Sequence, residues 1–252
     1  MTDAEIAARA LALLDLTDLT DHADAAGLAA LCAKAVAPPV PVAAICIWPR
    51  FVAQARSLLG AGPVRIATVV NFPAGADEAA AVVDDTRIAL AAGADEIDLV
   101  LPWRVFLTGD SESAAAMVAR VREASRGKTL KVILETGEYP DLVKVRAASE
   151  LAIVHGADFI KTSTGKTAHS ASLPAARTML EVIANAGRPV GLKPSGGIRS
   201  LADATGYLDL ADAIMGPGWA TAKTFRFGAS GLHQVLIEAM TGGKTERADG
   251  PY

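Results

Sequence analysis

Three charged residues interrupt segments that otherwise have the apolar composition of buried strands. Lys161 lies in "DFIKTST", Lys193 in "PVGLKPS" and Asp98 in "EIDLVLP". The strands of a parallel sheet that is covered on both faces are normally apolar throughout. Because a buried ion pair contributes little net stability, several charges in such strands indicate a functional site.

Two lysines on neighbouring strands suit Schiff-base chemistry. A lysine amine attacks an aldehyde only when it is neutral, and its reference pKa is about 10.4. A second ammonium group about 5 Å away costs roughly 3 kcal/mol at an effective dielectric constant near 20, which lowers a pKa by about two. One lysine is therefore a candidate nucleophile and the other its electrostatic activator. Asp98 could hold the second lysine and move protons through a water molecule.

A purely structural explanation remains open for each of these charges taken alone. Buried ion pairs form without any catalytic role, and long lysine stems can carry the charge to the rim of a barrel. The segment "LKVILET" adds Lys131 and Glu135, which alternation places on one face of the same strand. Several charges converging on one end of a barrel favour a functional explanation.

Short β-branched runs alternate along the chain with long segments rich in Ala and Leu. Strands are predicted at 13–17, 42–48, 64–70, 96–102, 130–136, 158–164, 189–195 and 211–216. Helical spacing of apolar residues covers segments such as Asp77–Ala92 and Leu173–Ala186. Glycines suited to helix C-caps precede several of the strands, namely Gly93, Gly127, Gly156 and Gly187.

This alternation over 252 residues predicts a (β/α)8 barrel, whose active sites lie at the C-terminal ends of the strands. The alternative is an open doubly wound sheet, but the Gly-rich turn that usually follows its first strand is missing from the sequence. We expect one barrel domain over residues 1–240 and a flexible tail over residues 241–252.

Three glycine-containing loops follow the last three predicted strands. They are "STGK" (163–166), "SGGIRS" (195–200) and "RFGAS" (226–230). Glycine lets backbone N–H groups approach an anion, and a following helix N-terminus adds its dipole. Each loop alone is explained by a plain turn. Together, at strands where barrels often bind phosphate, they predict a phosphate site.

Composition excludes several other classes of protein. The net charge is −4 without a long basic run, so binding to nucleic acid or a membrane surface has little support. No uncharged apolar stretch approaches about 18 residues, and no signal peptide is visible, so we expect a cytoplasmic protein. The histidines are scattered and the two cysteines, Cys32 and Cys46, form no metal-binding motif. We therefore expect neither a metal nor another cofactor.

With these residues in place, nearly the whole chain resembles the deoxyribose-phosphate aldolases, a family of class I aldolases. The matching segments are "LLDLTDLT", "AAICIWPRF", "RIATVVNFP", "ADEIDLVLPWR", "LKVILETGE", "GADFIKTSTGK", "GLKPSGGIR" and "RFGAS". The combination of "FIKTSTGK" with "GLKPSGGIR" is the most specific part. The resemblance implies reversible cleavage of 2-deoxy-D-ribose 5-phosphate to D-glyceraldehyde 3-phosphate and acetaldehyde, in deoxyribonucleotide catabolism, by an enzyme that is often a homodimer.

The resemblance also implies roles for individual residues. Lys161 matches the Schiff-base nucleophile, Lys193 the activating lysine and Asp98 the proton-transfer acid. Substrate-binding positions, including those that hold the phosphate, fall on Asp15, Thr17, Thr164, Gly165, Lys166, Gly196, Gly197, Gly228 and Ser230. Cys46 is either a small buried hydrophobe or a residue that points into the substrate site. Some members end in a tyrosine that helps to exchange the proton at the enamine carbon, so we expect Tyr252 to close over the substrate; an inert tail is the alternative.

Two positions depart from the pattern of some family members. Gly231 follows Ser230 where those members have a second serine, and Ser195 stands where they have alanine. Two other functions stay open at this stage. One is a different Schiff-base aldolase with a phosphorylated substrate, and the other is a barrel that binds a phosphosugar without catalysis.

Overall fold

The computed structural model describes residues 1–242, and its strands form one parallel sheet. The strands are β1 (Leu14–Asp18), β2 (Ala44–Ile47), β3 (Arg65–Val70), β4 (Glu96–Val100), β5 (Thr129–Ile133), β6 (Phe159–Lys161), β7 (Gly191–Lys193) and β8 (Phe227–Ala229). Their order in the sheet is β7-β6-β5-β4-β3-β2-β1-β8. The chain thus adds strands in sequence order, with β8 returning to the side of β1.

The sheet closes on itself between β7 and β8. Bridges pair Leu192 with Phe225 and Ser195 with Gly228. Backbone hydrogen bonds support them, because Leu192 N donates to Thr224 O at 2.9 Å and Gly228 N donates to Pro194 O at 2.9 Å. The sequence-based prediction of a (β/α)8 barrel is therefore confirmed.

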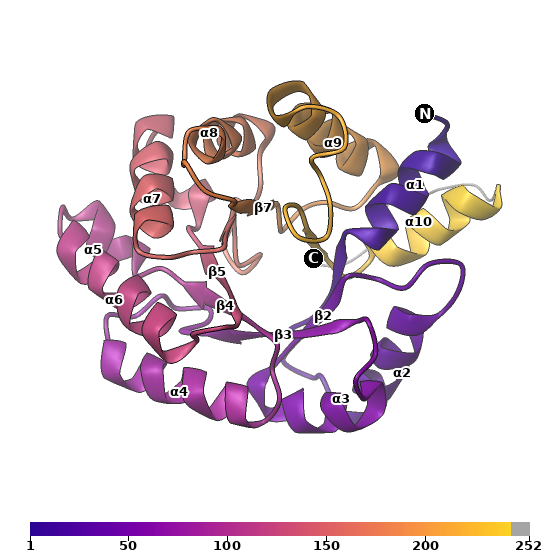
Figure 1. Ribbon diagram of the computed structural model, residues 1–252, viewed down its shortest axis with the longest axis horizontal. Helices are drawn as coiled ribbons and strands as arrows, with labels where there is room; N and C mark the ends of the chain where they lie inside the picture. The colour runs from indigo at the N-terminus through magenta and orange to yellow at the C-terminus, as the bar shows by residue number, and fades with distance from the viewer. Residues whose placement is uncertain (243–252) are drawn as a thin grey trace.

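Helices form a ring around the strands (Figure 1). They are α1 (Asp3–Ala12), α2 (Ala25–Val36), α3 (Val52–Leu59), α4 (Ala79–Ala91), α5 (Trp103–Leu107), α6 (Ser111–Ala124), α7 (Leu142–Val154), α8 (Leu173–Ala184), α9 (Leu201–Met215) and α10 (Leu232–Thr241). The short 3-10 turns η1 (Pro49–Phe51) and η2 (Thr136–Glu138) lie in loops. None of the helices in the described chain is long and apolar enough to cross a membrane.

Side-chain caps fix where several helices begin after a strand. Ser172 accepts the Ala175 N–H at the start of α8, and Ser200 accepts the Asp203 N–H at the start of α9. The Asp203 side chain in turn accepts the Ser200 N–H, which completes a capping box. These caps end the two loops that follow β6 and β7, so they fix the positions of loops next to the candidate site.

The eighth predicted strand is wrong. Residues 211–216 belong largely to α9, and β8 is Phe227–Ala229 instead. The helix α9 begins at the capping box of Ser200 and buries Ala204, Leu208 and Ala211 on one face. The apolar run at its C-terminal end was mistaken for a strand, because a short apolar run fits either structure. The true β8 is short and carries a central glycine, so its strand signal is weak. "RFGAS" therefore contains the eighth strand rather than following it.

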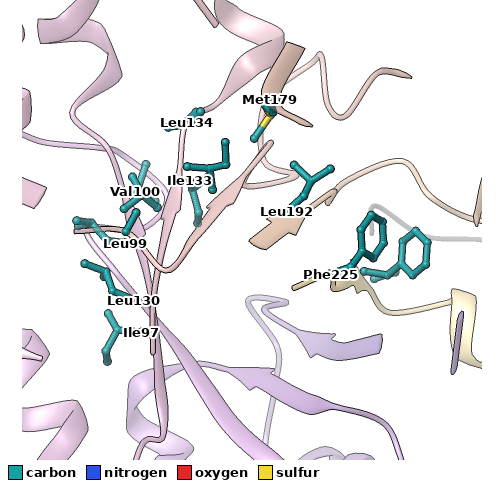
Figure 2. Packing of buried hydrophobic residues seen from close by; sticks show 14 of the residues in the cluster. Ile97, Leu99, Val100, Leu130, Ile133, Leu134, Met179, Leu192 and Phe225 are labelled. Carbon is teal, nitrogen blue, oxygen red and sulfur yellow. The ribbon is translucent and has the colours of Figure 1, made fainter. Parts of the chain in front are cut away.

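The apolar core lies mainly between the barrel and its helices. Figure 2 shows part of this cluster, with Ile97 and Leu99 leaving β4 on the same side. Successive strand residues point to opposite faces, so Asp98 between them faces the inside of the barrel. A smaller apolar cluster is separate from the main one and consists of Leu19, Cys46, Ala67 and Val69. Apolar side chains fill only part of the interior, and charged residues fill much of the rest.

Candidate active site

The charged residues of the strands meet inside the barrel because their registers match. Lys161 on β6 is directly paired with Lys193 on β7, and Asp98 on β4 is paired with Lys131 on β5. All four side chains are buried, with exposed fractions of 1% or less. Apolar side chains next to them along each strand point outward to the helices, so these four side chains point into the barrel. The arrangement gathers ionisable groups where water is excluded.

Asp98 is the centre of this cluster. Its Oδ2 accepts hydrogen bonds from Lys161 Nζ at 2.9 Å and from Lys193 Nζ at 2.7 Å. Its Oδ1 accepts one from Lys131 Nζ at 2.9 Å. Burial alone would raise the pKa of Asp98, but the three lysines outweigh it and hold that pKa well below its usual range. The carboxylate is therefore ionised.

Further ion pairs extend the cluster to Asp15, Glu96 and Arg226. Asp15 Oδ2 lies 2.5 Å from Lys193 Nζ, and Asp15 Oδ1 lies 2.6 Å from Arg226 Nη1. Glu96 joins Arg226 Nη2 at 2.9 Å and Lys131 Nζ at 2.5 Å. Lys131 Nζ also lies 3.3 Å from Asp15 Oδ2. We refer to these contacts, together with those of Asp98, as the barrel network.

The barrel network has one more cationic group than it has carboxylates. Within residues 1–242 its contacts join three carboxylates (Asp15, Glu96, Asp98) to four basic side chains (Lys131, Lys161, Lys193, Arg226). A buried unpaired charge is costly, so loss of one proton from a lysine balances the interior. Which lysine loses it depends on its partners.

Lys161 is the lysine with the fewest partners. In the described chain its Nζ pairs with one carboxylate, whereas Lys193 pairs with two and Lys131 with three. Burial lowers the pKa of Lys161, and nearby Lys193 lowers it further, although Asp98 opposes both. Burial acts on Lys193 and Lys131 too, but their carboxylates outweigh it and raise both pKa values. Lys161 is therefore the lysine best suited to be neutral.

Thr17 and Cys46 lie on paired positions of β1 and β2 at the edge of the barrel network. Thr17 Oγ1 donates to the backbone oxygen of Asp15 at 2.8 Å. Cys46 Sγ is 4.0 Å from Asp98 Oδ2, and burial raises the pKa of its thiol. Cys46 is both a member of the small inner apolar cluster and a neighbour of the candidate site.

The loops after β6 and β7 touch each other through glycines. Gly165, Gly196 and Gly197 have φ angles of 73°, 85° and 84°, in the left-handed region that glycine adopts without strain. A Cβ on Gly196 would lie 2.8 Å from Ser170 Oγ and 3.2 Å from Gly165 Cα, so only glycine permits this approach. The predicted phosphate-binding glycines of these two loops are thus brought together.

The remaining predicted phosphate residues occupy different settings. Lys166 is exposed, and its backbone N–H donates to Thr164 Oγ1 at 3.1 Å. Gly228 lies within β8, where an added Cβ would come 2.8 Å from Ser195 Cβ and 3.1 Å from Lys193 Cε. Gly228 therefore makes room for Ser195 and for the lysine stem. Ser230 lies just before α10 and, with Thr17, lines a cavity of about 610 Å³ between β1, α2 and α10.

Comparison with known proteins identifies the family. The sequence pattern of the DeoC/LacD family aldolases matches residues 9–228. The chain belongs to this aldolase family. A deoxyribose-phosphate aldolase of Agrobacterium fabrum is 52% identical over 250 residues, which is 98% of this chain and 96% of that protein. The lysines of the barrel network thus lie in an aldolase.

Solved structures of the aldolase family share this fold. A putative deoxyribose-phosphate aldolase from Coccidioides immitis superimposes with a TM-score of 0.82 at 27% identity, covering 92% of this chain and 86% of that one. One from Toxoplasma gondii ME49 gives a TM-score of 0.87 at 24% identity, covering 96% of both chains. A deoxyribose phosphate aldolase from Aeropyrum pernix, described as tetrameric, gives 0.76 at 24% identity, covering 94% of this chain and 92% of that one. The last two likenesses concern the fold alone.

Sequence reasoning missed part of the aldolase site. Glu96 and Arg226 were not predicted to belong to it, although Glu96 precedes Asp98 by two residues and so shares its face. The expectation that Lys131 and Glu135 share one strand face is wrong. The strand β5 ends at Ile133, and Glu135 adopts a left-handed conformation with φ 62°, which turns it toward Thr164 instead. Tyr252 lies outside the described residues, so its role stays a prediction.

Replacing Arg226 by Met should destabilise the fold strongly, because the buried oxygens Asp15 Oδ1 and Glu96 Oε1 lose the guanidinium donor that they contact, although lysines still pair with both carboxylates. We expect a loss of about 3–5 kcal/mol in the free energy of unfolding. Arg9→Met is the control, since Arg9 pairs with Asp212 near the surface and should cost about 1 kcal/mol or less. Denaturant unfolding of both variants measures the difference. Equal, small losses would show that the barrel network is not held by its ion pairs.

Proposed function

We propose that this protein reversibly cleaves 2-deoxy-D-ribose 5-phosphate to D-glyceraldehyde 3-phosphate and acetaldehyde through a Schiff base on Lys161. The observation that carries the proposal is the surplus cation of the barrel network, which favours a neutral Lys161 beside Asp98. The similarity to the Agrobacterium fabrum deoxyribose-phosphate aldolase supports the substrate. The sugar phosphate and the aldehydes are the expected small-molecule partners.

The first half of the proposed reaction builds the imine. The neutral Lys161 amine attacks the aldehyde carbon of the open-chain sugar, giving a carbinolamine that takes up one proton and loses water to become an iminium. The iminium carries the positive charge that Lys161 had given up. Asp98, 2.9 Å from Lys161 Nζ, is placed to stabilise that charge and to pass protons through water.

The second half breaks the carbon–carbon bond. A base removes the proton of the C3 hydroxyl, the bond between C2 and C3 breaks, and its electron pair moves toward the iminium nitrogen. D-Glyceraldehyde 3-phosphate leaves, and an enamine of acetaldehyde remains on Lys161. Protonation of the enamine carbon and hydrolysis by water release acetaldehyde and the free lysine. Lys193 stays cationic throughout, because Asp15 and Asp98 both hold it.

The phosphate is proposed to bind on the loops after β6 and β7 and at the end of β8. Gly165 and Gly196 have left-handed backbones that bring amide groups close to one another. Lys166 is an exposed cation on the same turn, and Ser230 precedes the N-terminus of α10. Thr17 and Cys46 are proposed to contact the sugar or aldehyde near the barrel network.

The proposed reaction also suggests a cellular setting. Cleavage of a deoxyribose phosphate serves the breakdown of deoxyribonucleotides, and we propose that role in the cytoplasm. We further propose that the protein forms a homodimer. A tetramer, as described for the Aeropyrum pernix enzyme, is the alternative. Sedimentation of the purified protein decides between these assemblies, and a monomer would exclude both.

Borohydride trapping tests the proposed function most simply. Reduction in the presence of acetaldehyde should leave a two-carbon adduct on Lys161, located by peptide mapping, and Lys161→Met should abolish it. Dihydroxyacetone phosphate serves as the second donor. An adduct formed only from dihydroxyacetone phosphate would indicate a different Schiff-base aldolase. Binding of the sugar phosphate with no adduct on Lys161 would indicate a non-catalytic barrel.

Lys193→Leu should shift the pH dependence of activity to the alkaline side. Removing this cation leaves the remaining charges of the barrel network balanced with Lys161 protonated, so the pKa of Lys161 should rise. Since the amine reacts only when neutral, activity at neutral pH should fall by about 100-fold or more and recover as the pH rises. Lys193→Arg, which keeps a cation, should keep the pH–rate profile close to that of the parent. A Leu variant with an unchanged profile would refute the activating role.

A further inference from the structure

Glu135 is a buried carboxylate that lies outside the barrel network. It lies two residues after the end of β5, its exposed fraction is 0%, and its backbone is left-handed with φ 62° and ψ 51°. Residues other than glycine rarely adopt this conformation, and it persists only where the surrounding contacts hold it. The steps proposed above for imine formation and bond cleavage do not use Glu135.

Both oxygens of Glu135 are occupied by the turn that follows β6. Glu135 Oε1 accepts the Thr164 N–H at 3.0 Å, and Glu135 Oε2 accepts the Thr164 hydroxyl at 2.6 Å. The Thr164 hydroxyl oxygen in turn accepts the Lys166 N–H at 3.1 Å. Thr167 Oγ1 adds a longer contact of 3.4 Å to Glu135 Oε1. The Glu135 carboxylate therefore holds Thr164 directly and Lys166 through the Thr164 hydroxyl, and these are the residues on either side of Gly165.

The backbones of the two loops are also locked together. Leu134 N donates to Lys161 O at 2.9 Å, and Thr136 N donates to Thr162 O at 2.9 Å. A Cβ on Gly137 would lie 2.2 Å from His169 O, so the turn after β5 is pressed against the loop after β6. The loop after β5 therefore fixes the position of the turn that follows Lys161.

A carboxylate suits this task better than an amide would. The Thr164 N–H and the Thr164 O–H both donate, so both side-chain oxygens must accept. Glutamine offers a single oxygen, and its NH₂ group would face one of the two donors. Burial raises the pKa of Glu135, but the two hydrogen bonds from Thr164 oppose this rise because they favour the ionised carboxylate.

We propose that Glu135 is a positioning residue that fixes the Thr164–Lys166 turn for the phosphate of the substrate. It thereby sets the preference for a phosphorylated over an unphosphorylated sugar, without touching either. This inference rests on the proposed function, because the turn is assigned there to the phosphate. Gly165 links the turn to Gly196 of the neighbouring loop, so misplacing the turn would open both sides of the phosphate site.

Glu135→Gln tests the proposal through substrate preference. We expect kcat/KM for 2-deoxyribose 5-phosphate to fall about 10- to 100-fold, mainly through KM, while kcat/KM for unphosphorylated 2-deoxyribose changes less than about threefold. Affinity for inorganic phosphate, measured by titration calorimetry, should fall by a similar factor. Glu138→Gln is the matched control, because it removes the same charge from the same loop and should leave the preference unchanged.

Two outcomes would overturn the proposal. A parallel loss for both sugars would show that Glu135 acts on Lys161 or on the fold, and an unchanged preference would show that the turn needs no such support. If Glu135→Gln does not fold, Glu135→Asp replaces it, because it keeps the carboxylate but shortens its reach to Thr164. Selective loss of the phosphorylated substrate in this variant supports the proposal, and any other pattern overturns it.

Calorimetry keeps this test separate from the proposed function. If the parent protein fails to cleave the deoxyribose phosphate, the proposed function fails. The ratio of inorganic phosphate affinities between parent and Glu135→Gln still tests the positioning role. A parent that cleaves the sugar phosphate but binds no inorganic phosphate overturns the positioning role alone.

Discussion

The site depends on one carboxylate, Asp98, that is shared by three lysines inside the barrel. A parallel barrel places alternate side chains of every strand in its interior, where apolar residues usually fill the space. Here the register of β4 to β7 brings Asp98, Lys131, Lys161 and Lys193 together instead. Since each ion alone would be costly to bury, every member needs the others, and the closed barrel keeps them at hydrogen-bonding distance.

The surplus cation connects this packing to chemistry. Lys161 has a single carboxylate partner within residues 1–242, so burial is least compensated there. In the proposed reaction a neutral amine in that position is the nucleophile, and the iminium it forms restores the charge beside Asp98. The strands would thus hold the reactive group rigidly, and the loops after β6 and β7 are proposed to bind the phosphate separately. Glu135 links the two parts, because it follows β5 and holds the turn that begins three residues after Lys161.

The sequence predicted the strand-borne charges better than it predicted their partners. Alternation within apolar segments was enough to single out Asp98, Lys161 and Lys193, and the repeated strand–helix pattern predicted the barrel. Arg226 was missed because its contacts with Asp15 and Glu96 span 211 and 130 residues, which no local pattern reveals. The eighth strand was misplaced because a three-residue strand containing Gly228 depends on β1 rather than on its own propensity. The left-handed backbone of Glu135 is likewise imposed by tertiary contacts.

Lys161 should lose its proton at a lower pH than Lys131 or Lys193, because burial of its amine is compensated by only one carboxylate within residues 1–242. Titration of the lysine Nζ chemical shifts by NMR in ¹⁵N-labelled protein, with Lys161 assigned from a Lys161→Arg variant, measures this directly. As the pH rises, we expect the Lys161 signal to change from ammonium to neutral amine while Lys131 and Lys193 are still protonated. A Lys161 signal that changes together with or after those of the other two lysines would contradict this order.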